Sequence, residues 1–160
     1  MRTSSSIPSI FAIGDCIDTI RLTPVAIAQA RKWAHTQFST TPFDAFFECI
    51  PTAVYALPEV ATVGLTQVEA EEQFDNVTNS LLRFRPLSHI LDTGLREKVF
   101  MKLVYEGVDQ RVVGAHISCD GASEIIQTLA ISIQKGIYKR DLDHTMALHP
   151  SIAEELVTIY

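Results

Sequence analysis

The chain has 160 residues, of which 47% are apolar and 20% charged, and it carries a formal net charge of −6. This composition is typical of a soluble globular protein with enough apolar material for a packed core. The negative charge argues against a partner made of nucleic acid, which normally requires a basic patch. No apolar run approaches the roughly 20 residues that span a bilayer. Residues 1–6 lack the apolar middle of a secretory signal, so we expect no membrane partner and a cytoplasmic location.

A short apolar stretch near the amino terminus, Ile7–Ile13, ends in Gly14 and Asp15. The stretch predicts a buried strand that enters a turn. A glycine at the end of a strand lets a ligand approach the backbone closely, and the carboxylate of Asp15 can accept hydrogen bonds from sugar-like hydroxyls. An ordinary Asx-type turn explains the same two residues equally well.

A helix is predicted after this turn. Thr23 is expected to be its N-cap and Pro24 its first helical residue, and it should run to about Phe38. The first N–H groups of such a helix are available to an oxygen-rich partner. The polar stretch 39–42 then predicts a linker, which divides the chain into segments 1–41 and 42–160.

Short strands and helices follow the linker. The apolar patterns predict strands at 52–56, 60–65, 77–84, 99–105 and 112–117, and helices at 66–74, 122–135, 139–144 and from 151 onward. Thr66 and Glu69 form a capping-box pattern, and Gly136 lies where a helix is expected to end. Strands in succession followed by helices predict an α+β sandwich with an antiparallel sheet.

The three cysteines, Cys16, Cys49 and Cys119, are far apart and odd in number. They form neither a disulfide framework nor a zinc-binding pattern, so we expect buried or inert thiols. The sequence also lacks a G-x-G-x-x-G motif, so we expect no dinucleotide-binding fold in this chain.

A second chemical motif lies near the carboxyl terminus. Pro150 keeps His149 out of the helix that is expected to begin at Ser151, and Glu154 falls one turn later, within reach of the imidazole. A histidine oriented by a carboxylate is what a general acid or base needs near neutral pH. The alternative is that Ser151 and Glu154 form an ordinary capping box and His149 is a loop histidine. In that case Glu155 could pair with the histidine instead.

The two motifs together resemble the flavoprotein disulfide reductase family, also called the pyridine nucleotide-disulfide oxidoreductases, over nearly the whole chain. The resemblance implies that 1–41 is a strand–helix remnant of the FAD-binding domain and that 42–160 is the dimerisation domain. The segments that carry it are 12–15, 22–26, 50–54, 61–66, 113–116, 124–127 and 149–158.

The resemblance also implies roles for single residues. Asp15 would bind the ribityl chain of FAD, with Leu22, Thr23 and Pro150 also on the cofactor side. His149 and Glu154 would be the catalytic pair.

Within the family, the branch that reduces glutathione disulfide fits best. Arg31 falls where that branch contacts its substrate, and a guanidinium suits an anionic peptide, although a surface helix arginine is the simpler explanation. Leu87, Glu155 and Thr158 match other substrate positions. Leu87 and Ser88, however, replace larger residues of close relatives.

The complete enzymes of this family use FAD and NADPH and a closely spaced cysteine pair. This chain has neither the nucleotide-binding motifs nor the cysteine pair, so we expect it to be inactive alone and to bind no cofactor stably. We expect a homodimer, or a dimer with a full-length relative, in which the carboxy-terminal segment of one subunit completes the site of the other. Two alternatives remain: a fragment of a branch that acts on dihydrolipoamide or mercuric ion, and a stand-alone dimerisation module without catalysis.

Overall fold

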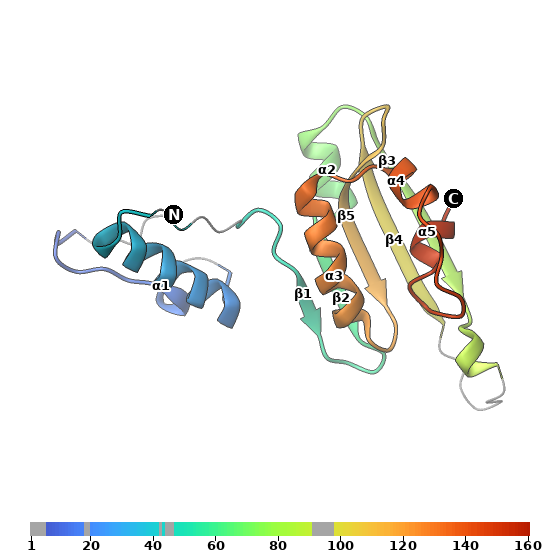
Figure 1. Cartoon of the computed structure of the whole chain (residues 1–160), viewed down its shortest axis with the longest axis horizontal. Helices are drawn as coiled ribbons and strands as arrows, with labels where there is room; N and C mark the ends of the chain where they lie inside the picture. The colour runs from blue at the N-terminus through green and yellow to red at the C-terminus, as the bar shows by residue number, and fades with distance from the viewer. Residues whose placement is uncertain (1–5, 18–19, 42, 44–46, 91–97) are drawn as a thin grey trace. The chain divides into compact units, whose positions relative to one another are not determined.

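The structure, a computed structural model, describes residues 6–17, 20–41, 43, 47–90 and 98–160, with Ser88 described by its backbone alone. The chain divides into two compact units, Met1–Phe47 and Glu48–Tyr160, here called unit 1 and unit 2 (Figure 1). The division falls later than the boundary expected after residue 41. Pro42, the last residue of the expected linker, lies outside the described residues. The assignment of 1–41 and 42–160 to two domains of the family stays a prediction.

Unit 1 contains a 3₁₀ turn, η1 (Gly14–Cys16), and a helix, α1 (Thr23–Phe38). The strand expected at Ile7–Ile13 was predicted wrongly, because only an isolated β-bridge at Phe11 forms there and both Ile7 and Ile10 are half exposed. A strand needs a neighbour to pair its backbone N–H and C=O groups. The described part of unit 1 contains no sheet that could supply one.

The turn and α1 are joined by a buried hydrogen bond, in which the Gly14 backbone N–H donates to Oε1 of Gln29 at 2.7 Å. Gly14 has a φ of +72°, and a Cβ added there would lie 3.1 Å from the Cβ of Ala26. Both the left-handed backbone and the close approach therefore favour glycine at this turn.

The start of α1 differs from the prediction by one residue. Leu22, with an extended backbone, is the N-cap, and Thr23 is the first helical residue with Pro24 after it. No side chain caps this end, whereas the end at Phe38 agrees with the prediction.

Unit 2 is built on an antiparallel sheet of five strands in the part of the chain that the structure describes. The strand order is β1-β2-β5-β4-β3, so β5 is the middle strand, between β2 and β4 (Figure 1). The strands are β1 (Thr52–Val54), β2 (Val60–Gly64), β3 (Val77–Phe84), β4 (Val99–Glu106) and β5 (Arg111–Ser118). The prediction of an α+β fold with an antiparallel sheet is confirmed.

Helices cover the two faces of the sheet unequally. The helices α3 (Ala122–Lys135), α4 (Lys139–Asp143) and α5 (Glu155–Thr158) pack on one face, and α2 (Gln67–Gln73) packs on the other (Figure 1). A short 3₁₀ turn, η2 (Leu87–His89), follows β3. The capping box of Thr66 and Glu69 at the start of α2 is present, as predicted.

The main core lies between the sheet and α3, α4 and α5. Alternate residues of β4 and β5 point into it, as the period of a strand dictates. Its most completely buried members are Ala61, Met101, Leu103, Ala115 and Ala122. Both strands of the pair β4–β5 contribute buried residues to this core.

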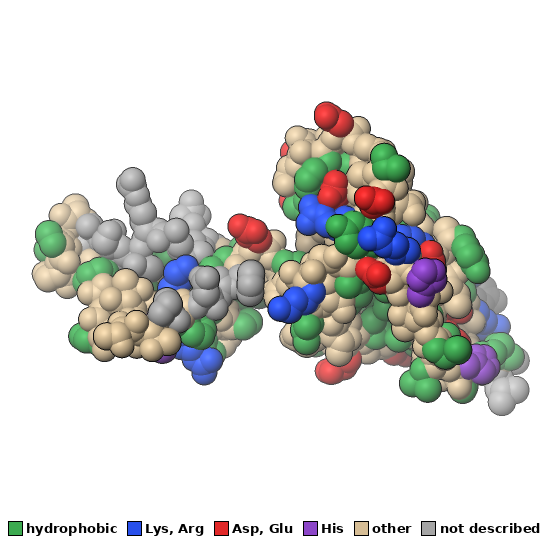
Figure 2. Space-filling model, turned by 45° about the horizontal axis from the view of Figure 1, so that its top comes forward, with side chains coloured by type: hydrophobic (Ala, Val, Ile, Leu, Met, Phe, Trp, Pro, Cys, Tyr) green, Lys and Arg blue, Asp and Glu red, His purple; other side chains and the backbone are tan. Residues whose placement is uncertain are grey.

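Acidic and basic side chains are interspersed on the face of unit 2 shown in Figure 2. This mixture fits the negative net charge and shows no continuous basic patch on that face. None of the described helices is long and apolar enough to cross a membrane.

Candidate functional site

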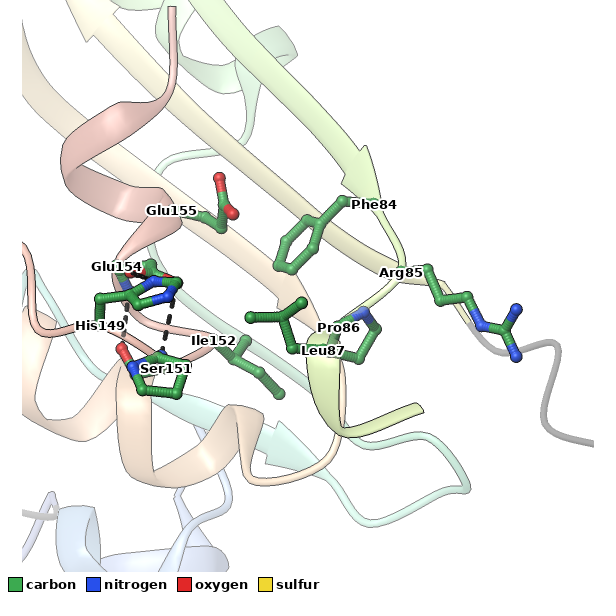
Figure 3. Close-up of a pocket in the computed structure, with 10 residues that line it drawn as sticks. Phe84, Arg85, Pro86, Leu87, His149, Ser151, Ile152, Glu154 and Glu155 are labelled. Atoms are coloured by element: carbon green, nitrogen blue, oxygen red, sulfur yellow. Dashed lines mark hydrogen bonds and ion pairs between the residues drawn. The ribbon is translucent and has the colours of Figure 1, made fainter. Parts of the chain in front are cut away.

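A cavity of about 520 Å³ lies in unit 2, between the end of β3 and the carboxy-terminal segment (Figure 3). These two walls are far apart in sequence. The fold brings them together because β3 is an edge strand of the sheet, and Phe84 at its end packs against the same core as Leu156 and Ile159 of the carboxy-terminal segment. The residues that line the cavity are Phe84, Arg85, Pro86, Leu87, His149, Pro150, Ser151, Ile152, Glu154 and Glu155.

His149 and Glu154 form a hydrogen-bonded pair at one side of the cavity (Figure 3). Nδ1 of His149 lies 2.9 Å from Oε2 and 3.1 Å from Oε1 of Glu154. The His149 side chain is 70% exposed, whereas that of Glu154 is only 14% exposed. The carboxylate is therefore fixed in the protein while the imidazole faces solvent, with its Nε2 left for a partner in the cavity.

Ser151 makes two hydrogen bonds with Glu154, one of them to the same carboxylate. The backbone N–H of Glu154 donates to Oγ of Ser151 at 3.1 Å, and the backbone N–H of Ser151 donates to Oε1 of Glu154 at 3.4 Å. The capping pattern and the histidine pairing therefore occur together, and Glu155 is not needed as a substitute partner. The bond between His149 and Pro150 is cis.

The helix expected to begin at Ser151 begins at Glu155. Ser151 to Glu154 instead form a turn, in which the Ser151 and Glu154 side chains accept hydrogen bonds from backbone N–H groups and the Glu155 N–H donates to the Ile152 carbonyl at 3.4 Å. The physical reason is that the carboxylate accepts hydrogen bonds from both the His149 ring and the Ser151 N–H, so the chain bends around this group before it becomes helical.

The carboxy-terminal segment is anchored in the main core. Leu156 of α5 and Ile159 are buried there, together with residues of α3 and α4. On the outer side of α5, Oγ1 of Thr158 donates to Oε2 of Glu155 at 3.0 Å. Glu155 lines the cavity, and Thr158 contacts Glu155 from the next turn.

The opposite wall is apolar. Phe84 and Leu87 point toward the carboxy-terminal segment, while Arg85 points away from the cavity (Figure 3). Leu87 thus lines the cavity, and its role as a substrate contact stays a prediction; the side chain of Ser88 is outside the described part. His89 lies 3.7 Å from Asp120, which ties η2 to the turn before α3. The sequence gives no signal for this pair, because no local pattern joins two residues so far apart.

The other candidate residues lie in unit 1. Asp15, Thr23 and Arg31 are exposed and Leu22 is half-buried. The exposed carboxylate of Asp15 and the start of α1, which no side chain caps, suit hydroxyl and carbonyl oxygens of a ligand such as FAD. Unit 1 therefore has groups that fit one flank of a flavin.

The cysteines differ in environment. Burial raises the pKa of the Cys119 thiol to about 11, with nearby Asp120 and Glu59 adding to the effect, and burial also raises the pKa of Cys49. Cys16 is exposed, so not every thiol is buried. The described residues contain no cluster of three His, Cys, Asp or Glu side chains that could hold a metal ion.

Residues 50–160 match the family model of the pyridine nucleotide-disulphide oxidoreductase dimerisation domain. The chain belongs to this family. The match covers the sheet, the described helices of unit 2 and the His149–Glu154 pair, and the resemblance inferred from the motifs is confirmed.

Glutathione reductases are among the curated proteins that are similar to this chain. That of Nostoc sp. is 43% identical over 159 residues, which are 98% of this chain and 34% of the relative. The glutathione reductase of Burkholderia cepacia is 42% identical over 158 residues, which are 99% of this chain and 34% of the relative. The chloroplastic/mitochondrial enzyme of Pisum sativum is 39% identical over 157 residues, which are 98% of this chain and 28% of the relative. The chain therefore spans about a third of the length of these relatives.

Among solved structures, the HOCl-induced flavoprotein disulfide reductase RclA from Escherichia coli is similar to this chain. The TM-score is 0.83 at 20% sequence identity, and the match covers 99% of this chain and 36% of RclA. This likeness supports the fold.

Proposed function

We propose that this chain is part of an NADPH- and FAD-dependent glutathione reductase, to which it contributes a His–Glu acid–base pair and a dimerisation surface. The observation that carries the proposal is the pairing of His149 with Glu154 at a cavity of about 520 Å³. Identity of 37–43% to glutathione reductases over nearly the whole chain supports the substrate class.

His149 would act on the leaving group of the substrate. In the complete enzyme, a redox thiolate attacks one sulfur of glutathione disulfide, the S–S bond breaks, and a mixed disulfide and a glutathione thiolate result. The imidazolium of His149 gives a proton to that thiolate, and the imidazole then accepts a proton from the next thiol that reacts. Glu154 holds Nδ1 and stabilises the imidazolium, as an orienting carboxylate does in other sites.

The cofactor and substrate residues complete this proposal. Asp15, Leu22, Thr23 and Pro150 would lie on the FAD side. When bound, FAD would supply the electrons that it receives from NADPH. Arg31 would bind a carboxylate of the glutathione moiety, and Leu87, Glu155 and Thr158 would line its binding site. We place the complete enzyme in the cytoplasm.

The dimer is the remaining part of the proposal. Helix α3 is the surface that we assign to the interface, because Ile131 on it is 61% exposed while its other face is buried in the core. A groove beside α3 is lined by Glu124, Ile125, Thr128, Leu129, Ser132, Ala153 and Leu156. A stand-alone dimerisation module would use the same surface without catalysis.

The substrate class can be tested with a chimaera in which this chain replaces the matching third of the Nostoc glutathione reductase. We expect NADPH-dependent reduction of glutathione disulfide and little activity with lipoamide or mercuric ion. Loss of the Arg31 charge in Arg31→Met should lower kcat/KM for glutathione disulfide by about 10-fold to 100-fold, the scale of a hydrogen bond to a charged group at about 1.5–3 kcal/mol. Lys32→Met, at the next position of α1, is the matched control. A chimaera that binds flavin but shows no preference for glutathione disulfide would contradict the proposal.

A further inference from the structure

The Glu154 carboxylate has two partners at once, His149 and Ser151. It accepts from Nδ1 of His149 at 2.9 Å and from the Ser151 backbone at 3.4 Å, while Oγ of Ser151 accepts from the Glu154 backbone at 3.1 Å. The dashed lines in Figure 3 trace this arrangement. Ser151 therefore does more than begin a turn.

We propose that Ser151 is a positioning residue, which fixes the Glu154 carboxylate so that neutral His149 carries its proton on Nδ1 and presents an unprotonated Nε2 to the cavity. The consequence for catalysis rests on the proposed function above, whereas the effect on the histidine ring does not.

The imidazole itself does little to fix the geometry of this pair. The His149 side chain is 70% exposed, and an exposed ion pair gains little by itself because both side chains lose rotamer freedom. Helix α5 has four residues and begins only after Glu154, so the regular helix does not include the carboxylate-bearing residue. The hydroxyl of Ser151 holds the Glu154 backbone, and through it the starting point of the Glu154 side chain.

The direction of the hydrogen bond decides the tautomer. A neutral imidazole has one N–H donor and one bare nitrogen, and the partner of each nitrogen determines which one carries the proton. A carboxylate only accepts, so a carboxylate held at Nδ1 favours the Nδ1–H form. That form leaves Nε2 as an acceptor, which is the state that takes a proton from a thiol.

The chain contains a second capping box that serves as an internal comparison. Oγ1 of Thr66 accepts from the Glu69 N–H at 3.3 Å, and Oε2 of Glu69 accepts from the Thr66 backbone and hydroxyl at 2.8 and 2.7 Å. This box begins α2 and makes no hydrogen bond to a histidine among the described residues. Removal of the Thr66 hydroxyl therefore removes a similar cap at a residue that does not line the cavity.

The test uses the 160-residue chain and the ¹⁵N and ¹H NMR spectra of the imidazole rings at a pH where His149 is neutral. The variants Ser151→Thr and Ser151→Val have nearly the same shape but differ in the hydroxyl, and Thr66→Val is the control. We expect Ser151→Thr and Thr66→Val to keep the wild-type Nδ1–H signature of His149. We expect Ser151→Val to lower the Nδ1–H to Nε2–H ratio by about threefold or more, a change of roughly 0.6 kcal/mol or more.

Two results would overturn the proposal. One is a His149 signature in Ser151→Val equal to that of the wild type. The other is an equal change in Thr66→Val, which would show a general effect of lost stability. In the chimaera, Ser151→Val should slow disulfide reduction more than Ser151→Thr does. If Ser151→Val changes the tautomer while His149→Ala reduces disulfide normally, the positioning role is supported and the proposed acid–base function fails.

Discussion

Leu156 links the site to the core, and its replacement by alanine tests how the carboxy-terminal segment is held. Helix α5 has four residues, too few to be stable alone, so its position depends on Leu156 and Ile159 in the core. A buried Leu→Ala change costs about 2–5 kcal/mol. Because Leu156 is 8% exposed and lies near the end of the chain, we expect about 2–3 kcal/mol. At roughly 4 °C per kcal/mol for a domain of this size, Tm should fall by about 8–12 °C.

The matched control is Leu148→Ala, the same change in the same segment at a side chain that is 77% exposed. It should change stability by no more than about 0.5 kcal/mol. Thermal unfolding followed by circular dichroism gives both values, and amide hydrogen exchange should show lost protection at Glu155–Thr158 in Leu156→Ala alone. Equal losses in the two variants would refute the reasoning that Leu156 anchors the segment.

Three further outcomes are expected. The isolated chain should purify without stoichiometric flavin, and a flavin absorbance of one per chain would contradict this. Ile131→Glu on α3 should shift the chain from dimer to monomer in sedimentation. The control Val108→Glu, at a turn side chain that is 92% exposed, should leave the dimer intact. A wild-type chain that is monomeric at high micromolar concentration would contradict the dimer. Burial lowers the pKa of His116 below its usual 6.5, so the neutral ring is favoured in the fold and stability should fall as pH drops from 6.5 through the folded pKa. The free energy of unfolding of His116→Gln should fall less over that pH range than that of the wild type. Urea unfolding of both proteins at several pH values measures this, and the same pH profile in the two would contradict it.

Much of the fold is predictable from local patterns. The sequence predicts β3 and α3 with the bounds that the structure has, because residue types that favour strands in β3 and the apolar stripe of α3 are local signals. The end of α3 at Gly136 is equally local, since its φ of +79° favours glycine.

The prediction fails where a segment depends on distant partners. The apolar residues of Ile7–Ile13 favour a strand, but a strand forms only beside another strand, and none lies in the described part of unit 1. The predicted start of α5 is wrong for a different reason. The Glu154 carboxylate accepts hydrogen bonds from two groups, His149 and the Ser151 N–H, and the helix begins only after this residue.

The candidate site shows the same division. The spacing of His149 and Glu154 predicts their pairing, and the pairing is present. The cavity could not be predicted from residue patterns alone, since its wall of Phe84 and Leu87 meets the distant carboxy-terminal segment only in the folded chain. The roles of these residues in cofactor and substrate binding stay predictions.

The acid–base role of His149 is tested most directly by stopped-flow measurement of the two half-reactions in the chimaera. His149→Ala should slow reduction of glutathione disulfide by about 100-fold or more, the usual scale for a general acid or base. Flavin reduction by NADPH should be nearly unchanged, because that half-reaction does not use the imidazole, and Glu154→Ala should lose less than His149→Ala. Disulfide reduction at the wild-type rate in His149→Ala would contradict the assignment and leave the Ser151–Glu154 turn as a structural cap.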